Sequence, residues 1–183
     1  MQESDKIDAA IGAAQNKAAL QSPDPADMRA FRAALGRFAT GVTVVTARRD
    51  EPEAGPLGIV ANSFASVSLD PPLVLWSPAR ASVRHAHFTA AKAFSIHVLH
   101  DAQADLILRF GRNGAGFDGL SYDLNAEDVP VLPDFHARFD CVTEAMHEGG
   151  DHTIIIGRVM RFATGSGTPM LFAHGAFGTF QKV

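Results

Sequence analysis

The sequence predicts a mainly β domain with a few helices, in which antiparallel strands form a barrel. Roughly seven segments show the alternation of apolar and polar residues, or the short continuous apolar run, that is typical of strands. The turns between them are mostly of the hairpin type, and only two or three segments have helical spacing. Strands that follow one another without intervening helices favour an antiparallel barrel over a doubly wound parallel sheet.

Length and charge limit the class of protein. The 183 residues are enough for one domain with an appendage. A net charge of −4 argues against a nucleic-acid or anionic-membrane partner, because such binding surfaces usually carry clustered Lys and Arg. No segment of the sequence approaches the roughly 20 apolar residues that span a bilayer. We therefore expect neither nucleic acid nor membrane among the partners.

Two features favour the cytoplasm. The single cysteine, Cys141, excludes an intrachain disulfide and fits a reducing compartment. The alternating residues around Cys141 predict a buried, inert thiol in a strand. Residues 1–15 carry acidic side chains and no apolar core of the signal-peptide type. We therefore expect a cytoplasmic protein.

The chain is expected to begin with an extension. Apolar residues at helical spacing in residues 1–20 predict an amphipathic or partly disordered helix, which ends before Pro23. The predicted organisation is an extension over residues 1–23 and one folded domain over residues 24–183.

A helix is predicted at the start of the folded domain. Asp24 suits the N-cap, Pro25 suits the first helical position, and Gly41 follows the expected end. Apolar residues three and four positions apart form a stripe that we expect to be buried on the barrel: Phe31, Ala34, Leu35 and Phe38.

The remaining elements follow from alternation and from turn residues. Strands are expected at residues 42–47, 57–68, 73–76, 93–99, 137–146, 153–162, 170–173 and 176–180. Short helices are expected to open at Arg80 and at Asp101, the second of them ending at Gly111. The prolines of residues 70–72 predict a rigid corner, and residues 148–151 predict a hairpin turn.

The stretch from Gly58 to Pro78 places polar residues among apolar ones. Buried hydroxyl and amide groups need hydrogen-bond partners, so this stretch suits a flat ligand that is partly hydrophobic and partly hydrogen-bonding. The alternative is an edge strand whose polar side chains face water. The polar residues are Asn62, Ser63, Ser66 and Ser68.

Five segments, in the right order over roughly 150 residues, resemble the flavin reductase-like, FMN-binding split-barrel family. They are FRAALGRFATGVTVVTA from Phe31, GIVANSFASVSLDPPLVLWS from Gly58, AFSIHVL from Ala93, GGDHTIIIGRV from Gly149 and PMLFAHGAFGTF from Pro169. The resemblance implies an antiparallel split barrel, a homodimer, and an NAD(P)H:flavin oxidoreductase that often serves a two-component monooxygenase.

A phosphate site is expected near residue 82. A hydroxyl and guanidinium groups at the first turn of a helix favour phosphate binding, which makes Ser82 with Arg80 and Arg84 a candidate. The resemblance places Ser82 on the serine that binds the FMN phosphate. Arg84 replaces the usual threonine, so charge is expected to contribute more and hydroxyls less.

The other cofactor residues come from the resemblance. The ANSF segment lies along the ribityl chain and the isoalloxazine edge, and Phe110 with Gly111 resembles the segment that closes over the flavin. His174 is similar to a basic or His residue near the flavin. The residues implied in these roles are Val60, Ala61, Asn62, Ser63, Ser77, Phe110, Gly111, His174 and Phe177.

His152 is the catalytic candidate. A histidine at a turn is ordinarily a solvated side chain. The GDH motif that it completes resembles the family motif whose histidine reaches over the flavin and contacts the nicotinamide. Its implied role is positioning, with proton transfer optional.

Two other motifs point elsewhere. Gly114 to Gly119 spells GxGxxG, but it follows a helix and precedes none, so it predicts a flexible lid or surface loop and not a dinucleotide site. The histidines at positions 85, 87, 97 and 100 lack the spacing of a zinc site, and no metal is expected.

The predicted function is hydride transfer from NADH or NADPH to FMN, with FAD also accommodated, for which the protein supplies near-attack geometry and electrostatic support. Reduced flavin would then reach a partner oxygenase. Two alternatives stay open: an FMN-bound oxidoreductase with another acceptor, such as a corrinoid, a quinone or oxygen, and a non-catalytic FMN-binding module.

Overall fold

The computed structural model describes residues 19–50, 52, 54–112 and 116–182, and the predicted helix over residues 1–20 lies almost entirely outside them. The chain divides into two compact units, with the boundary between Leu35 and Gly36. In the part of the chain that is described, no helix has the length and apolar character needed to cross a bilayer.

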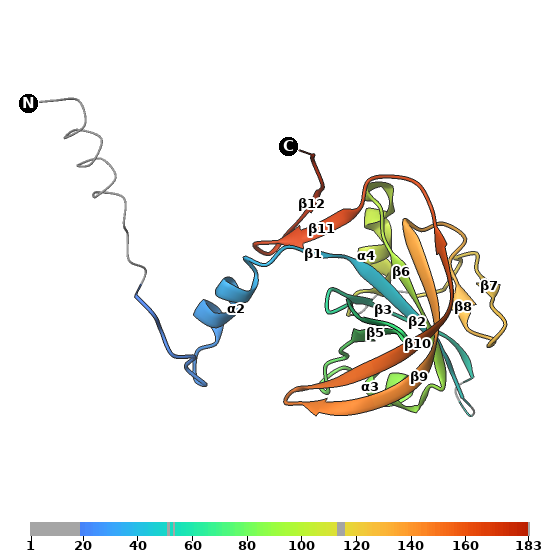
Figure 1. Ribbon diagram of the computed structural model, residues 1–183, viewed down its shortest axis with the longest axis horizontal. Helices are drawn as coiled ribbons and strands as arrows, with labels where there is room; N and C mark the ends of the chain where they lie inside the picture. The colour runs from blue at the N-terminus through green and yellow to red at the C-terminus, as the bar shows by residue number, and fades with distance from the viewer. Residues whose placement is uncertain (1–18, 51, 53, 113–115, 183) are drawn as a thin grey trace, which may run out of the picture. The chain divides into compact units, whose positions relative to one another are not determined.

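The helix of the first unit, α2, spans Arg29–Leu35 and is shorter than predicted (Figure 1). Asp24 does not cap it. Instead, its carboxylate accepts the N–H of Ala26 at 2.9 Å and its carbonyl accepts the N–H of Asp27 at 3.0 Å, which closes a turn. Asp27 then accepts the N–H of Arg29 at 3.1 Å. The predicted buried stripe is also wrong, since none of the residues of α2 is buried.

The second unit is built on an antiparallel sheet of seven strands in the order β3-β2-β6-β9-β10-β5-β4. The strands are β2 (Thr43–Arg49), β3 (Gly55–Ala61), β4 (Ala65–Leu69), β5 (Pro72–Trp76), β6 (Ala93–Val98), β9 (Ala137–Gly149) and β10 (His152–Thr164). All of their pairings are antiparallel, as the short connections predict for the pairs β2–β3, β4–β5 and β9–β10. The mainly β prediction is confirmed.

The two edge strands of this sheet, β3 and β4, are consecutive in the chain. Residues 62–64 alone connect them, although they stand at opposite ends of the strand order. A connection of this length spans at most about 14 Å, so the sheet must curve until its edges approach each other. The single strand predicted over residues 57–68 is therefore wrong, because the chain leaves one edge and enters the other within it.

Two smaller sheets complete the unit. Strands β1 (Thr40–Gly41), β11 (Met170–Ala173) and β12 (Ala176–Thr179) form one, and β7 (Asp123–Leu124) pairs with β8 (Pro130–Val131) in the other. The predicted hairpin of β11 and β12 is confirmed.

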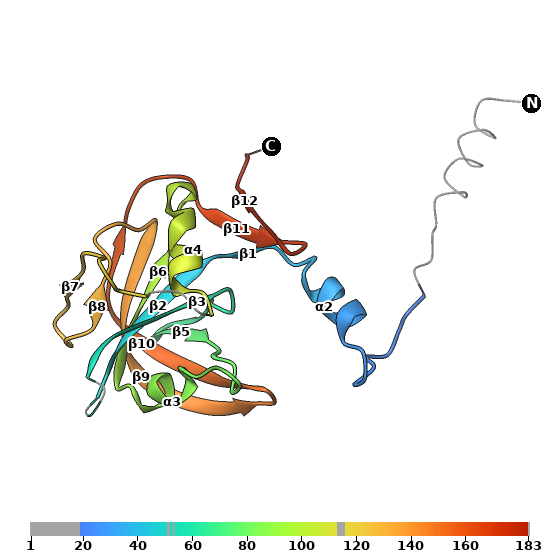
Figure 2. The ribbon, with the colours of Figure 1, turned by 180° about the vertical axis from the view of Figure 1, so that it is seen from behind.

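Two short helices lie toward opposite ends of the main sheet (Figure 1, Figure 2). Helix α3 spans His85–Ala90 and so begins later than predicted. Helix α4 spans Ala104–Phe110 after a 3₁₀ turn at Asp101–Gln103, and Gly111 ends it as predicted.

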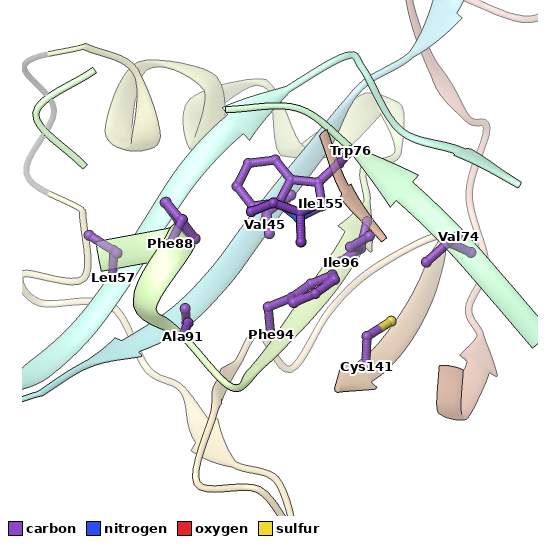
Figure 3. Close-up of a cluster of buried hydrophobic side chains, with 11 residues drawn as sticks. Val45, Leu57, Val74, Trp76, Phe88, Ala91, Phe94, Ile96, Cys141 and Ile155 are labelled. Carbon is purple, nitrogen blue, oxygen red and sulfur yellow. The ribbon is translucent and has the colours of Figure 1, made fainter. Parts of the chain in front are cut away.

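Two hydrophobic clusters form the core. The first surrounds the indole of Trp76, to which we refer as the Trp76 cluster (Figure 3). Its members come from six strands, from α3 and from the residue that follows α3: Val45, Ala47, Leu57, Val74, Trp76, Phe88, Ala91, Phe94, Ile96, Cys141 and Ile155. The second, the Phe110 cluster, comprises Val42, Val44, Leu99, Leu106, Phe110, Phe117, Leu132 and Met170.

Candidate functional site

Two clefts share Val60 of strand β3 in their linings. The larger has a volume of about 590 Å³, and its lining residues are Ile59, Val60, Ala79, Ala81, Ser82, Val83, Arg84, Phe110, Gly111 and Arg112. The smaller has a volume of about 230 Å³, and its lining residues are Val42, Val60, Ala61, Asn62, Phe172 and Phe177. Most of the predicted cofactor residues therefore meet around one strand.

A glycine lets the wall of the larger cleft form. A Cβ atom at Gly58 would lie 2.4 Å from Cε1 of Phe110, which is closer than any side chain tolerates. The missing side chain thus allows the ring of Phe110 to pack directly against β3. Phe117 then packs edge-on against Phe110 with ring centroids 5.0 Å apart. The GxGxxG segment therefore contributes a buried aromatic residue to the Phe110 cluster.

Arg84 joins two sides of the larger cleft. Its Nη1 donates to the carbonyl of Phe110 at 3.1 Å, and its Nη2 donates to the carbonyls of Gly111 at 2.8 Å and Arg112 at 3.4 Å. These carbonyls stand at the end of α4, where a helix has no internal donors for them. Partial burial lowers the pKa of the Arg84 guanidinium from its ordinary value.

Ser82 lies ahead of helix α3, not in its first turn. The helix begins at His85, and residues 79–84 form turns in which the N–H of Ser82 donates to the carbonyl of Ala79 at 3.0 Å. The Oγ of Ser82 accepts the N–H of Arg84 at 3.2 Å. The predicted helix start at Arg80 is wrong because these local hydrogen bonds compete with the helix.

Ser63 and Ser77 pair with each other. The N–H of Ser77 donates to Oγ of Ser63 at 2.9 Å, and this hydroxyl donates to the carbonyl of Ser77 at 3.3 Å. The pair ties the connection between β3 and β4 to the end of β5. Neither serine lines a cleft, whereas the neighbouring Asn62 is exposed and lines the smaller one.

The edge strand β4 carries another of the predicted polar residues. Ser66 is exposed there, which agrees with the alternative of an edge strand whose polar side chains face water.

His152 lies at the tip of the β9–β10 hairpin. Its Nδ1 is 2.7 Å from Oδ1 of Asp151, and its side chain is 42% exposed. The tip is attached to the segment before Ser82, since the N–H of Thr153 donates to the carbonyl of Pro78 at 3.1 Å and the N–H of Arg80 donates to the carbonyl of Asp151 at 2.8 Å. His152 borders this segment without lining either cleft.

Two predicted basic residues lie outside the clefts. Arg80 is exposed and pairs with Glu148 of the same hairpin at 3.3 Å. His174 is exposed at the turn between β11 and β12, with a φ of 52°, and its N–H donates to the carbonyl of Gly36. Phe177, by contrast, lines the smaller cleft, where its ring packs 5.1 Å from that of Phe172.

The sequence missed several lining residues of the clefts. Ile59, Ala79, Ala81 and Val83 supply apolar surface, and their small or apolar side chains carried no chemical signal. Arg112 is a charged residue that could have been found, because it follows the Gly111 predicted to close over the cofactor.

The lining of the larger cleft fits a flavin. Ile59, Val60 and Phe110 provide apolar surface for a planar ring system, while Ser82 provides a hydroxyl and two arginines provide positive charge for an anionic phosphate. Such sites combine apolar walls with a few well-placed polar groups.

Similarity to known proteins agrees with this fit. The chain is 55% identical over 160 residues to the FMN reductase (NADH) SmoA of Agrobacterium fabrum, covering 87% of this chain and 90% of the relative. It is 39% identical to the reductase component of the flavin-dependent trigonelline monooxygenase of Acinetobacter baylyi, covering 85% of this chain and half (50%) of that relative.

A solved structure shares the fold. The NADH:FAD oxidoreductase SgcE6 of Streptomyces globisporus, in complex with NAD and FAD fragments, superposes with a TM-score of 0.79 at 36% identity, covering 88% of this chain and 98% of the other. The family model described as "Flavin reductase like domain" matches residues 35–181. The chain therefore belongs to the flavin reductase-like family.

Proposed function

We propose that this protein is an NAD(P)H-dependent flavin reductase that transfers hydride to FMN, with FAD as a second acceptor. The observation that carries the proposal is the larger cleft, which joins an apolar wall on β3 to a hydroxyl and two guanidinium groups. Membership of the flavin reductase-like family and the name of the Agrobacterium relative support the same activity.

The residues around Val60 would hold the flavin. The apolar side chains of Ile59, Val60 and Phe110 would contact the ring system, and Ser82 would donate to the phosphate. Bound flavin supplies the N5 atom that accepts a hydride from the nicotinamide C4. The protein contributes orientation and exclusion of water, which need no acid or base at the reacting atoms.

His152 is the proposed nicotinamide contact. Two backbone hydrogen bonds hold its hairpin tip against residues 78–80, which precede the Ser82 side of the larger cleft. The carboxylate of Asp151 orients the ring through Nδ1, so Nε2 remains available for a ligand. The predicted roles of Ser63, Ser77, His174 and Phe177 beside the flavin stay proposals, whereas Arg80, which pairs with Glu148, is not assigned to the phosphate.

The proposal extends to the assembly. A split barrel is supported by the three-residue connection between the two edge strands of the main sheet. A homodimer is supported by large apolar side chains that remain exposed on this unit, among them Phe162 at 73% and Leu69 at 95%. A domain over residues 24–183 and a cytoplasmic location stay predictions.

An oxygenase is the proposed recipient of the reduced flavin. The Acinetobacter relative is named as the reductase component of a monooxygenase, and this supports the same arrangement here. The partner would receive flavin by diffusion, without a stable complex.

The test is NADH and NADPH oxidation with added FMN or FAD. Turnover that rises hyperbolically with added flavin supports the proposal. Turnover that does not depend on added flavin but requires another acceptor would indicate a different oxidoreductase. Bound flavin without oxidation of NADH or NADPH would indicate a non-catalytic binding module.

The same assay tests His152. His152→Ala should raise KM for the nicotinamide while flavin binding is retained. His147→Ala is the matched control, because His147 is exposed on the same hairpin and lines neither cleft. An unchanged KM in His152→Ala removes this residue from the site.

A further inference from the structure

The larger cleft contains two arginines in different surroundings. Arg84 is half-buried and holds three backbone carbonyls. Arg112 is exposed and lines the same cleft. Both carry a positive charge, but their positions suit different tasks.

The hydrogen bonds of Arg84 direct its charge toward the end of α4. The carbonyl of Phe110 lies at the negative pole of that helix and those of Gly111 and Arg112 follow it directly, and all three residues line the cleft that holds the proposed phosphate position. An anion would be repelled by these oxygens if they were uncovered. A guanidinium bound to them removes this repulsion and fixes the end of α4 against residues 82–84.

The side chain of Arg112 differs from that of Arg84 in its hydrogen bonds. Within the described part of the chain, no hydrogen bond or ion pair is made by its side chain, and only its backbone carbonyl is used, by Arg84. Its guanidinium can therefore turn into the cleft without breaking an existing contact. Arg84 would have to release its carbonyls to give an anion the same bidentate contact.

We infer that Arg112 binds the flavin phosphate together with Ser82, and that Arg84 is a positioning residue that acts through the end of α4. This inference rests on the proposed function. It differs from the sequence prediction, in which Arg80 and Arg84 supplied the phosphate contacts.

The experiment compares two flavins that differ in the phosphate. Dissociation constants of FMN and riboflavin are measured by flavin fluorescence on the full chain freed of flavin, for the wild type and for Arg112→Gln, Arg84→Gln and Arg84→Lys. Arg48→Gln is the matched control, because Arg48 is an exposed arginine that lines neither cleft.

Arg112→Gln is expected to weaken FMN binding roughly tenfold, to leave riboflavin binding unchanged, and to reduce the salt dependence of FMN binding. Arg84→Gln is expected to weaken FMN and riboflavin by the same factor, because it loosens the wall that both flavins touch. Arg84→Lys should recover part of the affinity for both, since an ammonium group still donates to the carbonyls. Arg48→Gln should match the wild type.

Two results overturn the inference. One is an unchanged FMN dissociation constant in Arg112→Gln. The other is a loss of FMN binding alone in Arg84→Gln or, if that variant does not fold, in Arg84→Lys. These are binding measurements and do not depend on turnover. A wild type that binds flavin but oxidises no nicotinamide would contradict the proposed function, whereas the assignment of the arginines would still be decided by the dissociation constants of FMN and riboflavin.

Discussion

The two hydrophobic clusters of the second unit have similar chemistry but different surroundings. The Trp76 cluster is closed, since none of its buried residues lines either cleft. The Phe110 cluster is open, because Phe110 lines the larger cleft and Val42 lines the smaller. The first cluster reaches the clefts only through the partly buried Ile59 and Ala61 that pack against it, whereas buried members of the second line the clefts themselves.

The clusters also differ in the titratable group beside them. Cys141 belongs to the Trp76 cluster, where burial raises the pKa of its thiol to about 12. His97 is fully buried next to Leu132 of the Phe110 cluster, where burial lowers its pKa to about 4. Its Nδ1–H donates to the carbonyl of Val44 at 3.2 Å, and its Nε2 accepts the N–H of Leu132 at 3.1 Å. Acidification should therefore affect the stability of the protein at His97, next to the Phe110 cluster.

The largest expected effect tests the closed cluster. Phe94 is 1% exposed and its ring lies 6.1 Å from that of Trp76. Phe94→Ala should lower the free energy of unfolding by about 3–5 kcal/mol, since it leaves a cavity. Urea unfolding measures the loss, and Phe94→Leu, which keeps more of the volume, should lose less. A change in FMN affinity of the folded fraction would contradict the separation of this cluster from the site.

A matched pair of glycines compares the clusters directly. A Cβ at Gly157 would lie 2.4 Å from Cζ of Phe94, the same distance that separates a Cβ at Gly58 from Phe110. Each substitution by Ala should cost about 1–3 kcal/mol of stability by overpacking. Only Gly58→Ala should also weaken FMN binding, because it displaces a wall of the cleft. Equal losses of FMN affinity in the two variants would show that both clusters contribute to flavin binding.

Acid should act through the open cluster. The folded chain keeps His97 neutral down to about pH 4, whereas the unfolded chain takes up a proton near its ordinary pKa of about 6.5. The free energy of unfolding should therefore fall as pH falls from 6.5 towards 4, by at most about 1.4 kcal/mol per pH unit from this group. Urea unfolding of His97→Gln at pH 7 and pH 5 should show a smaller dependence on pH than the wild type. Parallel curves would exclude His97 as the source.

The smallest effect concerns the thiol of the closed cluster. Cys141 is 1% exposed, and with a pKa of about 12 it carries almost no thiolate at neutral pH. Alkylation by iodoacetamide at pH 8 should be at least about a thousandfold slower in the folded protein than in urea, because the thiolate is the reactive form. Labelling of the folded chain at the unfolded rate would mean that the cluster opens readily.

Local patterns predicted the strands well. Alternation located β6 and the β9–β10 hairpin, and the predicted β11 and β12 agree closely with the structure. The burial of Cys141 followed from the same pattern. Errors arose where a local signal met a competing hydrogen bond, as at Asp24, whose carboxylate closes a turn, and at Ser82, whose hydroxyl accepts a nearby N–H.

The candidate site was only partly predictable, for a related reason. Val60, Asn62, Ser82 and Phe110 were identified through resemblance, and the fold brings them to adjoining clefts. The partners of Arg84 were not foreseen, because they lie 26 to 28 residues further along the chain. No pattern within a single segment encodes such a contact.

The order of side chains alone was therefore enough to establish an antiparallel, mainly β protein with one buried thiol, because a period of two residues is readable within a few positions. The contacts of each arginine, the approach of Phe110 to Gly58 and the burial of the Trp76 cluster away from the cleft surfaces emerged only in three dimensions. The physical reason is that a charged group takes its partners from whatever backbone packs beside it, and here that backbone comes from distant parts of the chain.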